Sequence, residues 1–162
     1  MRRNDKALKD RPAIDRVIRA CRICTLAMAD GGEPYAVPLN FGYDGASLYF
    51  HSAAVGKKID ILHKNPRVWF SFHTGGGLVR TGDGVCGWTS EYESVMGSGQ
   101  VVFLRGESEK RRGLDILTAH AAAGGGGDYD PRALDRILVF RVDILSLSGK
   151  KSPIRRGEDA DG

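Results

Sequence analysis

Apolar and polar residues alternate along several short stretches of the chain, which is the period of a β-strand with one buried face. The turn sequence DGGEP at 30–34 and the dipeptide DG at 44–45 separate the first three stretches, so we expect hairpins there. The expected strands are 23–29, 35–43, 47–51, 67–72, 85–88, 92–105 and 137–147.

Three other stretches repeat apolar residues every three or four positions, which predicts amphipathic helices. They are 12–21, for which Asp10 is a candidate cap, 57–64, and 107–122. Glycine is concentrated at 73–84 and at 124–127. We therefore expect a flexible surface loop at the first glycine-rich segment and a break after the third helix at the second.

Many short strands joined by hairpins, with few helices, favour a mainly β fold: an antiparallel β-barrel with helices packed outside it. A chain of 162 residues is long enough for one core, or for a core completed by a partner subunit. We expect a single domain at 12–149, with a mobile arm at 1–11 before it and a polar tail at 150–162 after it.

The composition is that of an ordinary globular protein, with 41% hydrophobic and 27% charged residues. The net charge is +4, but acidic and basic residues are interleaved, which argues against a nucleic-acid-binding face. No apolar run approaches the ~18 residues of a membrane span, and the charged start lacks the apolar region of a signal peptide. Because the three cysteines are also too few for a disulfide framework, we expect a cytoplasmic protein.

The C-x-x-C motif formed by Cys21 and Cys24 is expected to be structural. It follows a predicted helix and enters a strand, which is the reverse of the order in thioredoxin-like proteins. Cys86 alone does not complete a zinc site, so we expect no metal. Histidines without a ligand-like spacing, expected at the surface or in loops, are His63, His73 and His120.

The start of the second helix carries the strongest chemical signal. Gly56, Lys57 and Lys58 open this helix, and two lysines have the wrong charge for the positive end of a helix dipole. A bound anion would resolve the conflict, because free backbone amides and both ammonium groups would face it. The alternative is a solvated helix start without a ligand. A P-loop is disfavoured, because His51 and Lys58 stand where that motif needs Gly and Ser or Thr.

Several motifs taken together resemble the pyridoxamine 5′-phosphate oxidase-like family, over roughly residues 12–152. The likeness is closest to the flavin-nucleotide-binding branch that includes the Nim nitroimidazole-resistance proteins. It rests on EPYAVPLNFGY at 33–43, LYFHS at 48–52, GKKID at 56–60, NPRV at 65–68, YESVMGSG at 92–99 and SGKK at 148–151. It implies an antiparallel, Greek-key-like split β-barrel and a homodimer with FMN at the subunit interface.

The resemblance also implies a set of cofactor-binding residues. The phosphate would be held around the strand end and helix start, the flavin ring would lie along the strand before it, and the YESV segment would close the site, from the partner chain if the site spans two subunits. Glu93 departs from the basic residue that many relatives carry beside the serine of this segment. The implied phosphate contacts are His51, Ser52, Lys57 and Lys58. The implied contacts of the flavin ring are Pro38, Leu39 and Asn40, and the residues that would close the site are Ser94 and Val95.

We therefore expect an FMN-dependent oxidoreductase that passes electrons from NAD(P)H or another donor to a small organic acceptor, by resemblance a nitroaromatic one. His51 is the candidate catalytic residue, since an imidazole can donate a proton near neutral pH. FAD, F420 or haem stay open as alternatives to FMN. The alternative function is a non-catalytic flavin- or haem-binding module for storage or sensing on the same barrel.

Overall fold

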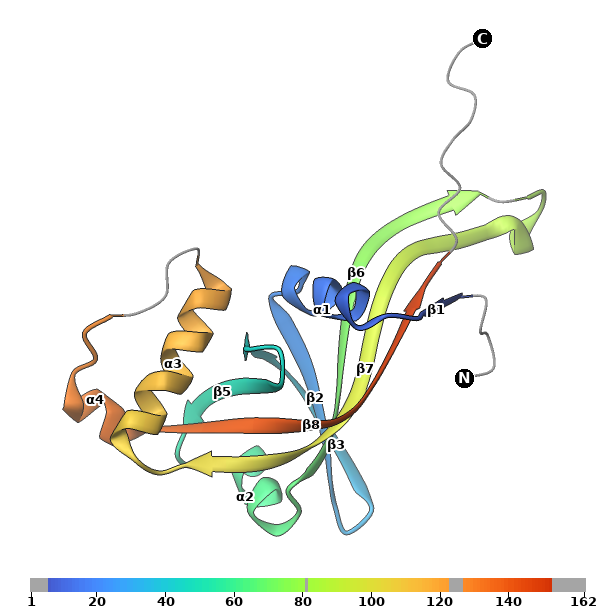
Figure 1. The fold of residues 1–162 in the computed structure, drawn as a ribbon. Helices are drawn as coiled ribbons and strands as arrows, with labels where there is room; N and C mark the ends of the chain where they lie inside the picture. Colours follow the sequence, from blue (N-terminus) through green and yellow to red (C-terminus); the bar gives the residue numbers. More distant parts are fainter. Residues whose placement is uncertain (1–5, 81, 123–126, 153–162) are drawn as a thin grey trace.

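The computed structural model describes residues 6–80, 82–122 and 127–152 (Figure 1). Its centre is an eight-stranded antiparallel sheet with the strand order β3-β2-β6-β7-β8-β5-β4, and β1 pairs with β8. The elements are β1 (Ala7–Leu8), α1 (Arg11–Ala20), β2 (Ile23–Asp30), β3 (Glu33–Asn40), β4 (Gly42–Tyr43), β5 (Ser47–Ala53), α2 (Lys57–Lys64), β6 (Arg67–Arg80), β7 (Trp88–Leu104), α3 (Glu107–Ala121), α4 (Pro131–Arg136) and β8 (Ile137–Lys151).

The inner face of the curved sheet surrounds the main hydrophobic core, as the strand alternation predicts. Burying each of its large apolar side chains contributes about 1.5–3 kcal/mol. Ile18 of α1 and Leu62 of α2 are fully buried with the strand residues, so both helices pack on this core. The largest fully buried side chains of the strands and of the turn before β4 are Phe41, Phe50, Phe70, Phe72 and Phe140.

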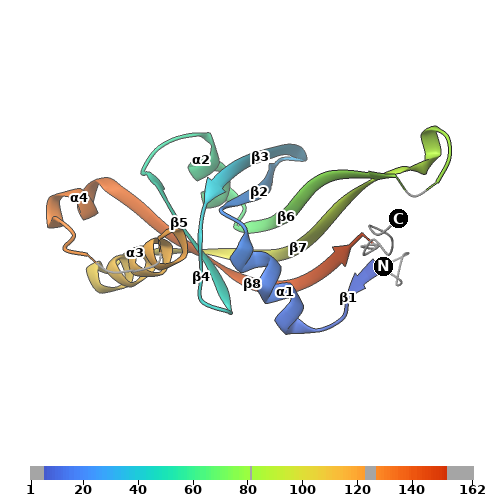
Figure 2. The same cartoon turned by 90° about the horizontal axis from the view of Figure 1, so that it is seen from above.

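A second, smaller cluster lies on the outer face of the sheet, beneath α3 and α4. Leu114 and Leu117 of α3 pack there with Tyr49 and Val139. The helix comes so close to β4 that a Cβ added at Gly42 would lie 2.7 Å from the backbone of Ile116. Figures 1 and 2 show α3 and α4 together at one end of the sheet, and the tip of the β6–β7 hairpin extending beyond the other end.

The glycine-rich segment at 73–84 is not the loop that we expected. Residues up to Arg80 belong to β6, which pairs with β7 as far as Arg80 opposite Trp88. A single 3₁₀ turn, Val85–Gly87, replaces the short strand expected at 85–88. Glycine lowers β propensity, but a ladder needs only backbone N–H and C=O groups, and the facing strand β7 provides them. The ladder between β7 and β8 has a register shift at Ser98 and Gly99.

The described structure extends beyond the expected bounds of 12–149 at both ends. Within the expected arm, Leu8 is buried and its backbone pairs with Gly149, and Asp10 accepts a hydrogen bond from the amide of Ala13 at the start of α1. The last strand continues to Lys151, and Ser152 is buried. The remainder of the arm and tail, and most of the expected break at 124–127, lie outside the described residues.

The three cysteines are free thiols. Cys21 and Cys24 are buried, as expected for structural residues, and burial raises the pKa of the Cys24 thiol far above its ordinary value. Within the described residues, no helix combines the length and the apolar character that crossing a bilayer requires. The same residues contain no group of three or more His, Cys, Asp or Glu side chains arranged to hold a metal ion.

Candidate functional site

The chain forks where β3 ends and β4 begins. Up to Asn40, which pairs with Ile23, the chain is bonded to β2; from Gly42, which pairs with Tyr49, it is bonded to β5. The chain therefore changes its pairing partner at Phe41, and β3 and β5 on either side of this point are not paired with each other. We call the region between β3 and β5 the fork. The segment GKKID follows β5 directly, so the helix start predicted to bind an anion borders the fork.

Strand alternation divides the predicted site residues between the two faces of the sheet. Pro38, Asn40 and His51 are exposed, and Ser94 is half-buried. Leu39 packs against the inner core, Ser52 is buried, and Val95 is completely buried in the core. The structure therefore brings the first group to the outer surface, whereas the side chains of Leu39 and Val95 are part of the core packing.

The start of α2 lacks the side-chain acceptor that is present at the start of the other three described α-helices. Asp10 in α1, Glu109 in α3 and Asp130 in α4 each accept a hydrogen bond from a backbone amide at the helix start. No side chain caps α2: its N-cap is Gly56, whose φ of 131° is strained for any other residue. Its first turn thus retains amides that an anion can accept from.

The two lysines of this turn are placed differently. Lys57 is exposed, and its Nζ lies 4.8 Å from the centre of the Tyr35 ring on β3, a cation–π contact that connects the helix start to the strand bordering the fork. Lys58 is half-buried. Both remain near the uncapped amides, so the predicted cluster of positive charge is present at the fork.

A cavity of about 280 Å³ lies between the fork and α3. Asn40 and His51, two of the predicted site residues, line it. Sequence reasoning missed the rest of its lining, because no local pattern indicates that α3 packs over the fork. The additional lining residues are Arg22, Phe41, Leu114, Leu117, Thr118, His120 and Ala121.

Two of the missed residues are held in place by hydrogen bonds. Arg22 donates through Nη1 to the carbonyl of His120 at 3.3 Å and to the carbonyl of Ala121, at the C-terminus of α3. His120 places Nε2 2.9 Å from the carbonyl of Cys21, which can only accept, so Nε2 carries the proton. The ring of His120 also packs on Phe41, with centroids 4.4 Å apart.

The comparisons with known proteins identify the family and the fold. A family model described as pyridoxamine 5′-phosphate oxidase matches residues 10–151. The chain belongs to this family. The expected resemblance and the split-barrel fold are thereby confirmed. No curated protein matches the chain.

Several solved structures are similar to this oxidase-family chain. A candidate 5-nitroimidazole antibiotic resistance protein from Bacteroides thetaiotaomicron is 33% identical, with a TM-score of 0.80 over 89% of this chain and 85% of that one. A FAD-binding protein from Mesorhizobium loti is 26% identical, with a TM-score of 0.68 over 91% and 98%. A FAD and haem binding protein from Mycobacterium smegmatis shares the fold at 23% identity, with a TM-score of 0.83 over 96% and 77%.

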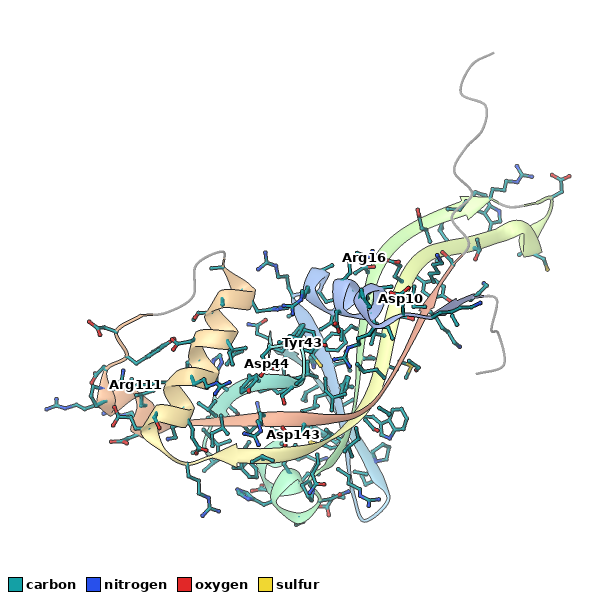
Figure 3. All side chains as sticks on the ribbon, viewed as in Figure 1. Asp10, Arg16, Tyr43, Asp44, Arg111 and Asp143 are labelled. Atoms are coloured by element: carbon teal, nitrogen blue, oxygen red, sulfur yellow. The ribbon has the colours of Figure 1, made fainter. Side chains whose placement is uncertain are left out.

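Glu93, the departure from the family pattern, pairs with α1. Its two carboxylate oxygens accept from Nη1 and Nη2 of Arg16 at 2.9 and 2.8 Å, and Figure 3 shows Arg16 on α1 beside the β6–β7 hairpin. The hydrogen bonds from Arg16 hold the pKa of the Glu93 carboxyl below its ordinary value. In this member of the oxidase family, the position thus attaches a helix to the sheet.

Two neighbouring rows of side chains on the outer face of the sheet, close to the fork, carry no charge. Cross-strand partners share a face, so the register defines two rows of side chains that each cross five strands. On these rows Trp69 is 58% exposed and Met96 is 52% exposed. The rows are Ala36, Ala27, Trp69, Ser98 and Ser146, and Pro38, Thr25, Ser71, Met96 and Ser148.

We call these ten residues the open face, because no described helix covers them. Pro38, a predicted contact of the flavin ring, is one of them, and Ser94 lies two residues from Met96 on the same side of β7. A hollow of about 550 Å³, lined in part by Trp69, Ser98 and Leu145, lies over this face. An uncharged surface that leaves large side chains such as Trp69 and Met96 exposed, next to predicted cofactor residues, suits the binding of a partner.

Proposed function

We propose that this chain binds FMN at the fork, as a homodimer, and reduces a small organic acceptor with electrons from NAD(P)H. The observation that carries the proposal is the uncapped first turn of α2, with Lys57 and Lys58, beside the outward-facing Pro38, Asn40 and His51. The family membership and the nitroimidazole-resistance relative support the redox chemistry and the nitroaromatic class of acceptor.

The residues of the fork suit a flavin phosphate. The amides of the α2 start and the ammonium groups of Lys57 and Lys58 provide hydrogen-bond donors and positive charge. A bound flavin would supply the electron transfer, while the protein contributes binding, orientation and exclusion of water. In this arrangement Pro38 and Asn40, at the end of β3, face the flavin ring.

His51 is proposed as the proton donor to the reduced acceptor. Its imidazole is exposed and lines the cavity next to Asn40, so a molecule bound there can accept its proton directly. Histidine is the side chain that most readily exchanges a proton near neutral pH.

The open face is proposed as the surface that joins two copies of the chain. Dimers with twofold symmetry bury the same patch on both subunits, which suits an uncharged, self-complementary surface. Because Pro38 lies on this face and Ser94 beside it, a second copy docked there also covers the cofactor. Each site then contains residues of both subunits, and Ser94 contributes across the interface.

A second candidate function is a flavin- or haem-binding module without catalysis, with FAD in place of FMN. It is favoured by the Mesorhizobium and Mycobacterium neighbours, which are named for FAD or haem binding. Within this chain, the cavity between the fork and α3 is small for a haem, at about 280 Å³, and Nε2 of His120 is engaged by the carbonyl of Cys21. Both observations count against haem, and the nitroimidazole-resistance relative leads us to rank the oxidoreductase above a flavin-binding module without catalysis.

The deciding experiment is an absorbance spectrum of the purified protein, with the released cofactor identified by mass. The proposal predicts a flavin spectrum, the mass of FMN, bleaching of the flavin band by NAD(P)H without oxygen, and recovery of the band when a nitroaromatic compound is added. A haem Soret band, or a flavin that neither nicotinamide reduces, would contradict the enzyme and favour the binding module.

A further inference from the structure

We propose that the cavity between the fork and α3 is a substrate subsite for an anionic, single-ring aromatic molecule, with Arg22 as the residue that selects its acid group. The inference rests on the proposed function, because it assigns the acceptor of that reaction a chemical class. It adds a specificity-determining residue and a wall, α3, that the predicted cofactor site does not include.

The size and base of the cavity favour one aromatic ring. Its volume of about 280 Å³ is at the lower limit of pockets that hold drug-sized molecules. Phe41, Leu114 and Leu117 line it with side chains that are at most 8% exposed, which gives it an apolar base. Burial of a ring against these three residues supplies affinity, and the polar side chains around them supply orientation.

The charge of the lining favours an anion. Arg22 is the permanent charge among the lining residues, His51 and His120 add imidazoles, and none of these described residues is acidic. The negative end of the α3 dipole offsets part of the charge on Arg22. However, the bonds to the α3 carbonyls use only Nη1, and a guanidinium has donors on Nε and Nη2 as well.

Arg22 is also preorganised. Its attachment to the carbonyls of His120 and Ala121 holds the guanidinium at the cavity before a ligand arrives. Less side-chain entropy is then lost on binding than for a free arginine. Since Asn40 and His51 line the same cavity, a ligand whose acid group contacts Arg22 also lies beside the proposed proton donor.

The test compares 4-nitrobenzoate with its uncharged analogue 4-nitrobenzamide, by calorimetric titration of the whole protein, with flavin content measured separately. We expect wild-type protein to bind the acid at least about tenfold more tightly than the amide, as a charge-assisted hydrogen bond predicts. Arg22→Gln should abolish this preference without releasing flavin. Arg19→Gln is the matched control, since Arg19 is a nearby arginine on α1 that does not line the cavity.

Arg22→Lys distinguishes the loss of a charged contact from a loss of folding around Arg22. It keeps the charge, so it should keep most of the preference for the acid even if α3 is loosened.

If Arg22→Gln retains the preference, or wild type shows none, the subsite is contradicted. If Arg22→Gln releases flavin, the cavity belongs to the cofactor and the inference is overturned while the proposed function stands. If the wild type holds no flavin but prefers the acid, the proposed function fails and the subsite stands.

Discussion

The outer face of the sheet has two halves that differ in how they are shielded from solvent. At one end, α3 and α4 cover it, and Tyr49, Leu104 and Val139 are at most 6% exposed. On the open face, no described helix is present, and Trp69 and Met96 are each more than half exposed. Both halves belong to one continuous sheet, and the cover provided by α3 and α4 accounts for the difference in exposure.

The covered half is packed by the chain's own helices, whereas the open face is left for a partner to cover. The covered half has its own cluster of buried side chains, whereas the open face carries uncharged, solvent-exposed rows. The fork lies at the boundary between them: Pro38 belongs to the open face, and His51 lines the cavity under α3. In our account, the cofactor and the second subunit meet on the open side of this boundary, and the substrate binds on the covered side.

The largest effect is expected from Trp69→Arg on the open face. A buried tryptophan is commonly a hot spot of an interface, and an unpaired charge there adds a desolvation cost, so we expect to lose about 4 kcal/mol of dimerisation, roughly a thousandfold in Kd. Sedimentation velocity measures it. Ala133→Arg, at an exposed site on α4 over the covered half, is the control and should leave the dimer intact. Equal association of both variants would contradict the assignment of the open face.

The second-largest effect is expected at the start of α2, where we propose that the flavin phosphate binds. Replacing Lys57 and Lys58 together with Ala removes two charges from the α2 start, and we expect FMN to bind about a hundredfold more weakly, or about 3 kcal/mol. Fluorescence titration of apoprotein with FMN measures this, and circular dichroism checks the fold. Lys64→Ala, at the other end of the same helix, should bind FMN normally although it loses its ion pair with Asp30. Unchanged FMN affinity in the double variant would refute the proposed phosphate site at the start of α2.

Gly42→Ala tests the covered half. The added methyl would meet the backbone of Ile116 at 2.7 Å, so α3 must shift from the sheet. Overpacking of this kind costs about 2 kcal/mol in the free energy of unfolding, which chemical denaturation measures. Gly77→Ala is the control, because nothing lies within 4 Å of its added Cβ. If the open face is independent of α3, the dimer should persist in both variants.

The smallest effect is expected from Glu93→Gln, which breaks the attachment of α1 to β7. The pair is partly exposed, with 61% of the Arg16 side chain accessible, so we expect a loss of about 1 kcal/mol at neutral pH. Because folding lowers the pKa of Glu93, its contribution is complete above the ordinary pKa of a glutamate, about 4.3. It is lost as the pH falls through the lowered value.

Denaturation curves at several pH values should therefore show wild type and Glu93→Gln converging in acid. Glu91→Gln, on the same strand and exposed, is the control and should follow wild type throughout. A constant gap between wild type and Glu93→Gln down to low pH would mean that the carboxylate does not act through its charge.

Local patterns predicted most of the strands and three of the helices, because alternation and helical spacing are properties of neighbouring residues. The anion site at the start of α2 comes from the same kind of local signal and stays a prediction. Alternation alone also implied that His51 and Ser52 face opposite sides, although both were grouped around the phosphate. The strand character of 73–80 was missed because it depends on pairing with a distant strand. His120 and Arg22 were missed as site residues for the same reason: only the packing of α3 over the fork brings them together.

The central claim is that a second copy and the cofactor share the open side of the fork. Sedimentation velocity of the holoprotein, recorded at both the flavin band and the protein band over a range of concentrations, tests it most directly. We expect the flavin absorbance to sediment with the dimer and to be lost as dilution produces monomer. Flavin that sediments with a stable monomer would contradict it.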